Sequence, residues 1–296
     1  MGITGVARAV AMEKPYAAGR AALVWRQFRR DRAALVGGVV LIVLTLVAVF
    51  APVVAPSDPI LVTVGQRLLP PSRAHPFGTD ELGRDVLSRI IFGARISMTV
   101  GLISVGVALV IGVTLGLVSG YLGGWVDNVI MRFIDVLLAF PGNLLAIVIA
   151  GTLGPGLRNV MIAVGIFSVP TYARVVRGTT LSVKEQEYIE ALRALGASDG
   201  RIMLRHILPN VSAPVIVLST LGVATAILSA AGLSFVGLGA QPPTPEWGSM
   251  LSQARPYLRH EWWMATFPGV AIAVTVLAIN LVGDGLRDAL DPRLRT

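Results

Sequence analysis

Residues 96–126 read ISMTVGLISVGVALVIGVTLGLVSGYLGGWV and contain no Asp, Glu, Lys or Arg. A helix needs roughly 20 apolar residues to cross the hydrocarbon core of a bilayer, so this stretch is long enough to span a membrane. Gly112, Gly116 and Gly120 recur within it at every fourth position. Small residues at that spacing let two helix backbones approach closely. The stretch therefore predicts a transmembrane helix with a packing face for another helix, in the same chain or in a partner.

Five further stretches without ionisable side chains lie on either side of it. They are residues 33–57, 136–157, 159–173, 211–238 and 262–283. The shortest is 159–173, and Pro170 lies near its end. The next one ends before QPPTP at 241–245, because these prolines cannot continue a helix. Together with 96–126 they predict an all-α polytopic membrane protein with six transmembrane helices and both termini on the same side.

The composition supports a membrane protein over a soluble one. Of the 296 residues, 54% are hydrophobic and 14% are charged, whereas about a quarter of a soluble domain is charged. The net charge of +8 is compatible with a nucleic-acid partner, but apolar spans separate the basic residues. We therefore attribute it to the excess of Lys and Arg in cytoplasmic segments and expect no nucleic acid. Most of the 25 lysines and arginines become cytoplasmic when both termini are placed inside.

The interiors of the predicted spans contain no ionisable side chain. Because such groups usually mark ion or proton paths in membranes, their absence argues against an ion-driven carrier. Asn143 and Asn280 are the most polar residues in mid-span, and each could line a path or bond a neighbouring helix. Five tryptophans fall at span edges or in loops, where indole favours the membrane interface. They are Trp25, Trp125, Trp247, Trp262 and Trp263.

Cysteine is absent and the three histidines lie far apart, so we expect no metal site and no cofactor. A phosphate-binding loop needs Gly-x-x-x-x-Gly-Lys-Ser/Thr, and neither Lys14 nor Lys184 has that context. Any ATP hydrolysis therefore falls to another chain. Gly232-Leu-Ser234-Phe resembles the Gly-x-Ser-x of rhomboid proteases, which would need a histidine on a later span as base. The one later histidine, His260, falls in a loop and not on a span. We therefore keep a rhomboid-like protease only as the alternative function.

Residues 181–210 read LSVKEQEYIEALRALGASDGRIMLRHILPN, between the fourth and fifth spans. An apolar stripe with the i, i+3, i+4, i+7 spacing of an amphipathic helix runs through them. Its members are Tyr188, Ala191, Leu192 and Leu195. Gly196 can end this helix in the left-handed conformation. Ser198 or Asp199 can cap a second short helix, and Pro209 marks its end or a bend into the fifth span. The periodicity leaves open whether the stripe packs on the bundle or in a groove of another protein.

The amino-acid sequence of this loop resembles the EAA loop of ABC importer permeases. The matching residues are Glu190, Ala191, Leu192, Gly196, Ile207, Leu208 and Pro209. Leu192 replaces the second alanine of the family pattern, and His206 stands where that pattern has isoleucine. Three further segments resemble the C-type subunits of dipeptide and oligopeptide permeases. They are HPFGTDELGRDVLSR at 75–89, AGLSFVGLGAQPPTPEWG at 231–248 and NLVGDGLRDALDPR at 280–293.

The resemblance implies a type I ABC importer transmembrane domain in a bacterial cytoplasmic membrane, and a transport subunit that is not an enzyme. It implies four kinds of partner besides membrane lipid: a homologous second permease subunit, two cytoplasmic ABC ATPase subunits, an extracytoplasmic substrate-binding protein and a dipeptide or oligopeptide substrate. Importers of the same family for nickel, haem or another small solute remain alternatives. The implied division is a cytoplasmic segment (1–32), a first transmembrane helix (33–57), an external loop (58–95), a five-helix permease core (96–285) with the coupling loop (181–210), and a cytoplasmic tail (286–296).

The resemblance also implies roles for single residues. Glu190 would make polar contacts with an ATPase, and Ala191 and Leu192 would fill its groove. Gly196 would permit the turn between the two short helices. The residues that would fix the second short helix against the fifth span are Ile207, Leu208 and Pro209. Residues 241–248 would form an external turn or re-entrant segment near the binding protein. The candidates for the pore lining are Asn143, Ser234 and Asn280.

Overall fold

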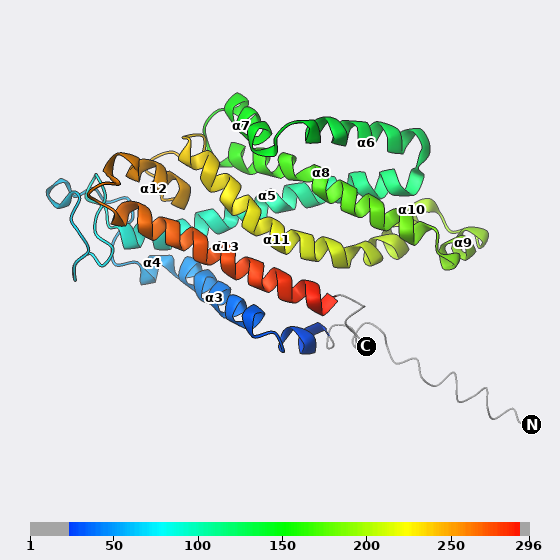
Figure 1. The fold of residues 1–296 in the computed structure, drawn as a ribbon, viewed down its shortest axis with the longest axis horizontal. Coiled ribbons are helices and arrows are strands. Elements are labelled where there is room, and N and C mark those ends of the chain that lie inside the picture. Colours follow the sequence, from blue (N-terminus) through cyan, green and yellow to red (C-terminus); the bar gives the residue numbers. More distant parts are fainter. Residues whose placement is uncertain (1–23, 291–296) are drawn as a thin grey trace, which may run out of the picture.

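Long helices lie side by side along the molecule, and most of the short helices lie toward its two ends (Figure 1). The computed structural model describes residues 24–290. The longer helices are α3 (Arg32–Val49), α5 (Val86–Leu122), α6 (Gly124–Ala139), α8 (Leu157–Lys184), α11 (Leu208–Phe235) and α13 (Trp263–Leu290). The shorter ones are α4 (Ala51–Val54), α7 (Gly142–Leu153), α9 (Glu187–Ala194), α10 (Asp199–Ile202) and α12 (Trp247–Ala254). We call the two ends of the bundle the α9 end and the α12 end (Figure 1).

The fold class predicted from the sequence is confirmed. Among the described residues, five helical segments are long and apolar enough to cross a membrane, and a sixth span results if α6 and α7 are counted together. Helix α10, a π-helical turn (Met203–Ile207) and α11 form one of these segments without a break. The part of the chain that the structure describes has no β-sheet, only an isolated bridge between Thr79 and Asp85.

Helices α5 and α8 pack along each other at the centre of the bundle, and the predicted glycine face forms their contact. A Cβ atom added at Gly116 would lie 2.8 Å from the Cβ of Val176. One added at Gly120 would lie 2.8 Å from the Cβ of Thr180. Glycine is therefore required for this close approach of the two backbones. The predicted packing face is confirmed, and its partner is α8 of the same chain.

Two prolines affect the predicted spans in opposite ways. The expected straight span 136–157 is wrong, because α6 and α7 meet at an angle of 92°. Phe140, which precedes Pro141, has an extended backbone with ψ of 136°, as steric contact with a proline ring favours. Pro170, by contrast, lies inside α8, which is longer than the predicted 159–173. Membrane helices tolerate such a proline where neighbouring helices surround it, and Pro170 is buried.

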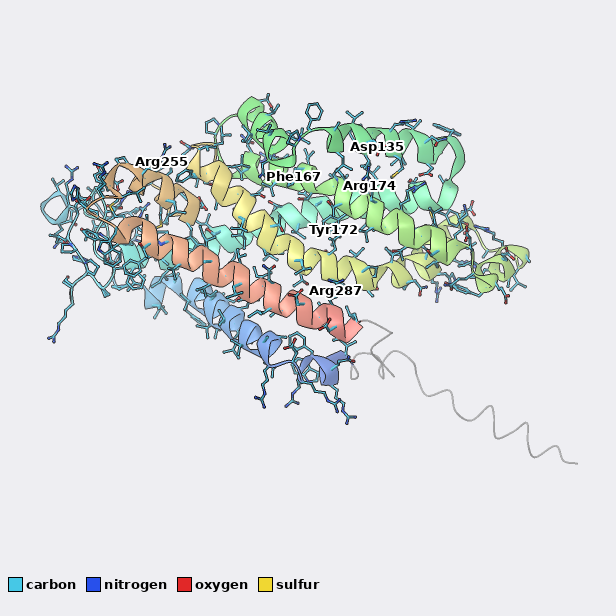
Figure 2. The ribbon with its side chains drawn as sticks, in the orientation of Figure 1. Asp135, Phe167, Tyr172, Arg174, Arg255 and Arg287 are labelled. Atoms are coloured by element: carbon cyan, nitrogen blue, oxygen red, sulfur yellow. The ribbon has the colours of Figure 1, made fainter. Side chains whose placement is uncertain are left out.

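Helices α6 and α8 extend beyond the charge-free stretches, and ionisable side chains pair in these extensions. Arg177 donates from Nε and Nη2 to both carboxylate oxygens of Asp127, at 2.6 and 2.5 Å. Arg174 Nη2 lies 2.7 Å from Asp135 Oδ1, and Figure 2 shows this pair between α6 and α8. Both arginines lie beyond the charge-free stretch that served to predict the span. The helix continues through them because each has a carboxylate partner.

Helix α3 lies against α13, so helices from the two ends of the described chain are neighbours (Figure 1). The carboxylate of Asp31 caps α3 by accepting from the backbone N–H groups of Ala33 and Ala34, at 2.8 and 3.2 Å. Such a cap satisfies N–H groups that have no partner within the helix. A Cβ atom at Gly37 would lie 2.9 Å from the Cβ of Leu281. A small residue thus allows close packing here as well.

Paired charges fix the α12 end. Arg84 Nε lies 2.6 Å from Asp80 Oδ2, and Arg89 Nε lies 3.4 Å from the same oxygen. The side chains of both arginines are at most 2% exposed. Arg84 Nη2 also donates to Gln253 Oε1 at 3.2 Å, which joins the loop before α5 to α12. We call Asp80, Glu81, Arg84 and Arg89 the buried charge cluster.

The expected interfacial placement is wrong for two of the five tryptophans. Trp247 and Trp263 are 1% and 6% exposed and belong to one apolar core at the α12 end. Trp247 Nε1 donates to the Ile90 carbonyl, and Trp263 Nε1 donates to the Thr79 carbonyl, each at 3.1 Å. Trp247 opens α12, in the segment 241–248 expected to form an external turn or re-entrant segment. These indoles pack α12 and α13 against α5 and the loop that precedes it.

Candidate functional site

Helix α9 projects from the bundle at the α9 end (Figure 1). Ile189 and Leu192 turn inward and pack with Ile202 and Ile207 of the chain that follows. Ile189 is 0% exposed. One face of α9 is therefore held by the protein's own core. The predicted apolar stripe omitted Ile189, the residue that carries most of this burial.

The opposite apolar face of α9 has no cover among the described residues. Tyr188 and Leu195 are 40% and 84% exposed, and Ala191 between them is also exposed. Glu190 is exposed on the adjoining polar side. We call Tyr188, Ala191 and Leu195 the outer face of α9. Of the predicted stripe, Leu192 therefore packs on the bundle, whereas Tyr188, Ala191 and Leu195 remain exposed.

A glycine turn follows α9. Gly196 has a φ of +79°, in the left-handed region that side chains with a Cβ atom rarely adopt. Its N–H donates to the Arg193 carbonyl at 2.9 Å, and the N–H of Ala197 donates to the Leu192 carbonyl at 3.0 Å. This confirms that Gly196 ends the helix in the left-handed conformation. Ser198 stands at the N-cap of α10, although its hydroxyl makes no capping bond.

The second short helix continues directly into the fifth span. Ile207 is fully buried and closes the π-helical turn. Leu208 is half-buried at the first position of α11, and Pro209 follows it in the first turn, exposed. Pro209 has no N–H to donate to the preceding turn, and the π-helical turn Met203–Ile207 lies just before it. Pro209 therefore neither ends nor breaks this helix.

Tyr121 connects α9 and α10 to the long helices. It is 4% exposed, and its hydroxyl donates to Asp199 Oδ1 at 2.6 Å. The Arg193 guanidinium lies 5.4 Å from the centre of its ring, and Lys184 Nζ lies 5.7 Å from it. Cations at such distances are attracted to an aromatic face. Lys184 Nζ also donates to the Tyr121 carbonyl at 2.6 Å.

Sequence reasoning missed this tyrosine. The available signal was its position directly after Gly120, the last glycine of the packing face. A residue there is brought against α8 close to the point where α9 begins. Tyr121 therefore belongs to α5, contacts the end of α8 through Lys184, and holds both short helices.

The three pore-lining candidates lie in different surroundings. Asn143, in the first turn of α7, lines a cavity of about 300 Å³ between α7 and α11. Ser234 is 3% exposed near the end of α11, and Asn280 is half-buried in α13. Neither of these two lines that cavity. His260 is exposed in a loop, and no hydrogen bond joins it to Ser234 among the described residues.

Comparison with known proteins agrees with this architecture. Residues 112–296 match the family described as binding-protein-dependent transport system inner membrane component. Residues 20–71 match the N-terminal transmembrane domain of oligopeptide transport permease C. The fold is similar to a chain of the MetNI methionine ABC transporter in an inward-facing conformation, with a TM-score of 0.57 at 20% identity, covering 68% of this chain and 96% of that chain.

Curated relatives are much closer in sequence. The dipeptide transport system permease protein DppC of Alkalihalophilus pseudofirmus is 48% identical over 92% of this chain and 90% of its own length. The glutathione transport system permease protein GsiD of Escherichia coli (strain 536) is 52% identical over the same shares of the two chains. The corresponding GsiD of Pectobacterium atrosepticum is 49% identical over 92% of this chain and 91% of its own length. This chain therefore belongs to the family of binding-protein-dependent transport system inner membrane components.

Proposed function

We propose that this chain is one of two permease subunits of an ABC importer for short peptides, and that the outer face of α9 docks on a separate ATPase subunit. The observation that carries the proposal is the uncovered outer face on a firmly anchored helix. Leu195 is 84% exposed. An apolar face on a projecting helix needs a partner that buries it. A groove on another protein suits a short amphipathic helix.

The anchoring of α9 supports a mechanical role. Ile189 fixes the inner face, and Tyr121 binds Asp199 and faces Arg193. A displacement of α9 therefore moves the ends of α5 and α8 with it, because packed side chains transmit strain. Closure of ATP-bound ATPases against α9 would in this way change the orientation of the membrane helices. No step of the cycle requires a nucleotide on this chain.

The orientation proposed has the α9 end and both termini in the cytoplasm. Cytoplasmic segments of membrane proteins carry an excess of Lys and Arg. Exposed arginines cluster beside α9, at Arg193, Arg201 and Arg205. ATP is cytoplasmic, so an ATPase-docking face belongs on that side. The α12 end would then face outward and receive a substrate-loaded binding protein.

The substrate class rests on the names of the relatives. Those reported above transport a dipeptide or glutathione, and both compounds are short chains of amino acids joined by amide bonds. A matching permease subunit and two ATPase subunits would complete the importer. None of the relatives reported above is named for nickel or haem.

Replacement of Leu195 tests the docking face. In the importer purified with its ATPase subunits, Leu195→Asp is expected to lower ATPase retention and dipeptide uptake by about tenfold or more, because it places a charge in an apolar groove. Leu258→Asp is the matched control, since Leu258 is 55% exposed at the α12 end. It is expected to retain the ATPases fully. Equal retention by the two variants would refute the docking role of α9.

Two further substitutions examine the roles assigned to Glu190 and Gly196. Gly196→Pro forces φ to negative values and removes the N–H that bonds to the Arg193 carbonyl. Glu190→Arg reverses an exposed charge beside the outer face. Both variants are expected to insert into the membrane normally and to lose dipeptide uptake. Normal uptake by both would show that these positions do not take part in coupling.

A further inference from the structure

A cavity between α7 and α11 takes no part in the coupling role proposed above. Its volume is about 300 Å³, near the lower limit of small-molecule pockets. Its lining combines two polar side chains, Asn143 and Ser229, with small residues and aliphatic ones. It contains no charged side chain. The cavity lies in the half of the bundle nearer the α12 end (Figure 1).

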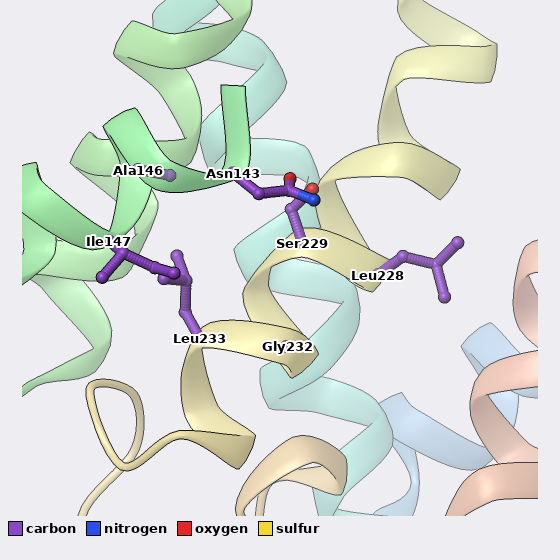
Figure 3. A pocket seen from close by; sticks show the side chains of 7 residues that line it. All are labelled: Asn143, Ala146, Ile147, Leu228, Ser229, Gly232 and Leu233. Carbon is purple, nitrogen blue, oxygen red and sulfur yellow. The ribbon is translucent and has the colours of Figure 1, made fainter. Parts of the chain in front are cut away.

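The two polar groups face the same space. Figure 3 shows the amide of Asn143 and the hydroxyl of Ser229 pointing toward each other from α7 and α11. None of the side-chain hydrogen bonds among the described residues involves either of them. Polar groups in a membrane protein usually bond a neighbouring helix. Here their donors and acceptors remain available to a molecule in the cavity.

The break between α6 and α7 shows what this face of the protein contacts. Helix α6 has 16 residues, which at 1.5 Å per residue is about 24 Å, short of the roughly 30 Å of a hydrocarbon core. With α6 beginning at the cytoplasmic surface, as in the orientation proposed above, the break at Phe140 and Pro141 falls within the bilayer, and both residues are exposed. Non-helical backbone at that depth occurs where protein covers it or where it lines a water-filled cavity. This face thus borders the inside of the importer rather than lipid.

Small side chains create the space of the cavity between α7 and α11. Ala146 lies on the α7 side and Gly232 on the α11 side. A Cβ atom added at Gly232 would have no neighbouring atom within 4 Å. Gly232 therefore does not serve a close helix contact, in contrast to Gly116 and Gly120 of α5. Its effect is to keep the cavity open.

We propose that this cavity binds the peptide group of a substrate in transit, an assignment that rests on the proposed import of short peptides. The side-chain amide of Asn143 has one carbonyl acceptor and one NH₂ donor, the same pair that a peptide bond offers in return. Ser229 supplies a second donor or acceptor. Ile147 and Leu233 provide an apolar wall for one substrate side chain.

The lining also excludes other ligand chemistries. Without a charged side chain the cavity cannot pair with a peptide's ionised termini, with a phosphate or with a divalent cation. Recognition is then limited to the backbone amide, which all peptides share. Such a site would pass peptides of different sequence and leave selection among them to the binding protein.

A filled cavity tests this assignment. In the complete importer reconstituted in proteoliposomes, with ATP and the binding protein, Gly232→Leu is expected to lower the rate of dialanine uptake by about tenfold or more, because it occupies the space of one residue. Gly106→Leu is the matched control, since a Cβ at Gly106 of α5 also has open space around it but lies outside the cavity. Both variants should retain the partner subunits.

The polar contact has its own test, which needs no transport readout. The chain has no cysteine, so Asn143→Cys introduces a single thiol for maleimide labelling in the intact importer. Dialanine delivered by the binding protein is expected to slow labelling of Asn143→Cys severalfold and to leave labelling of Gly106→Cys unchanged. Asn143→Leu should lower uptake about tenfold, as loss of a hydrogen-bonding group does, and Asn143→Gln should restore part of it.

The outcomes separate this inference from the proposed function. If the wild-type importer takes up dialanine but Gly232→Leu and Asn143→Leu take it up at the same rate, with no protection of Asn143→Cys, the cavity is not a substrate site. If the wild-type importer takes up no peptide at all, the proposed function itself fails. Slower uptake in both variants together with protection of the thiol would support the assignment.

Discussion

The two ends of this bundle differ in which side chains they bury and which they expose. At the α12 end the guanidinium groups of Arg84 and Arg89 are buried and paired with carboxylates. At the α9 end charged side chains are exposed, and Leu195 points outward at 84% exposure. The difference agrees with the proposal that the exposed α9 end docks on an ATPase subunit.

The largest expected effect comes from breaking the buried charge cluster. Arg84→Met leaves the buried carboxylate of Asp80 with the longer contact to Arg89 as its one remaining ion pair among the described residues, beside the backbone N–H groups of Leu82 and Arg84. Removing one partner of a buried ion pair costs about 3–5 kcal/mol. We expect a clear loss of thermal stability in detergent, measured by the unfolding of the purified chain. A change comparable to that of an exposed control, Arg259→Met, would show that the cluster does not stabilise the α12 end.

A smaller effect is expected at the α9 end from Tyr121→Phe. The change removes the hydroxyl that donates to Asp199 and keeps the ring that faces Arg193. A hydrogen bond to a charged group contributes about 1.5–3 kcal/mol. We expect hydrogen exchange of the backbone in 187–199 to accelerate while exchange in α12 stays unchanged. Unaltered exchange in 187–199 would mean that Tyr121 does not anchor α9.

The smallest effect concerns Glu81 at the edge of the charge cluster. Burial raises the pKa of its carboxyl group, and the nearby charge of Asp80 raises it further. A raised pKa means that the folded protein disfavours the ionised form of this carboxyl group. The contribution of Glu81 to folding stability is therefore most favourable at low pH and declines as pH rises through the folded pKa. Glu81→Gln is therefore expected to be slightly stabilising near neutral pH and indistinguishable from wild type in acid. Melting temperatures of both proteins across this pH range provide the measurement, and a destabilised variant at neutral pH would contradict this sign.

Several structural features of this bundle can be predicted from a few neighbouring residues. The spacing of Gly112, Gly116 and Gly120 predicts a helix contact, because only a small residue lets two backbones approach. Gly196 predicts the end of α9 for a similar reason, since glycine adopts a positive φ readily. In both cases one residue and its immediate neighbours determine the structure, so one sequence is enough to predict it.

The features that escaped prediction depend on segments far apart in the chain. Trp247 has the same local context as an interfacial tryptophan, but α5 covers it, and its indole donates to the Ile90 carbonyl. The extent of α8 was underestimated because Asp127, which neutralises Arg177, lies on another helix. The cavity beside Asn143 depends on a 92° bend between α6 and α7 that Pro141 permits without specifying its angle. Charge counting along the sequence contains none of this information.

Helix α9 is the proposed surface at which an ATPase acts, and its neighbour in the importer can be identified directly. The most direct measurement places the photoreactive amino acid p-benzoylphenylalanine at position 195 and, separately, at position 258, in cells that express the whole importer. Irradiation is expected to join position 195 covalently to a protein with a Walker phosphate-binding loop, and to give no such product from position 258. Capture of the ATPase from position 258 alone, or of lipid alone from position 195, would contradict the account.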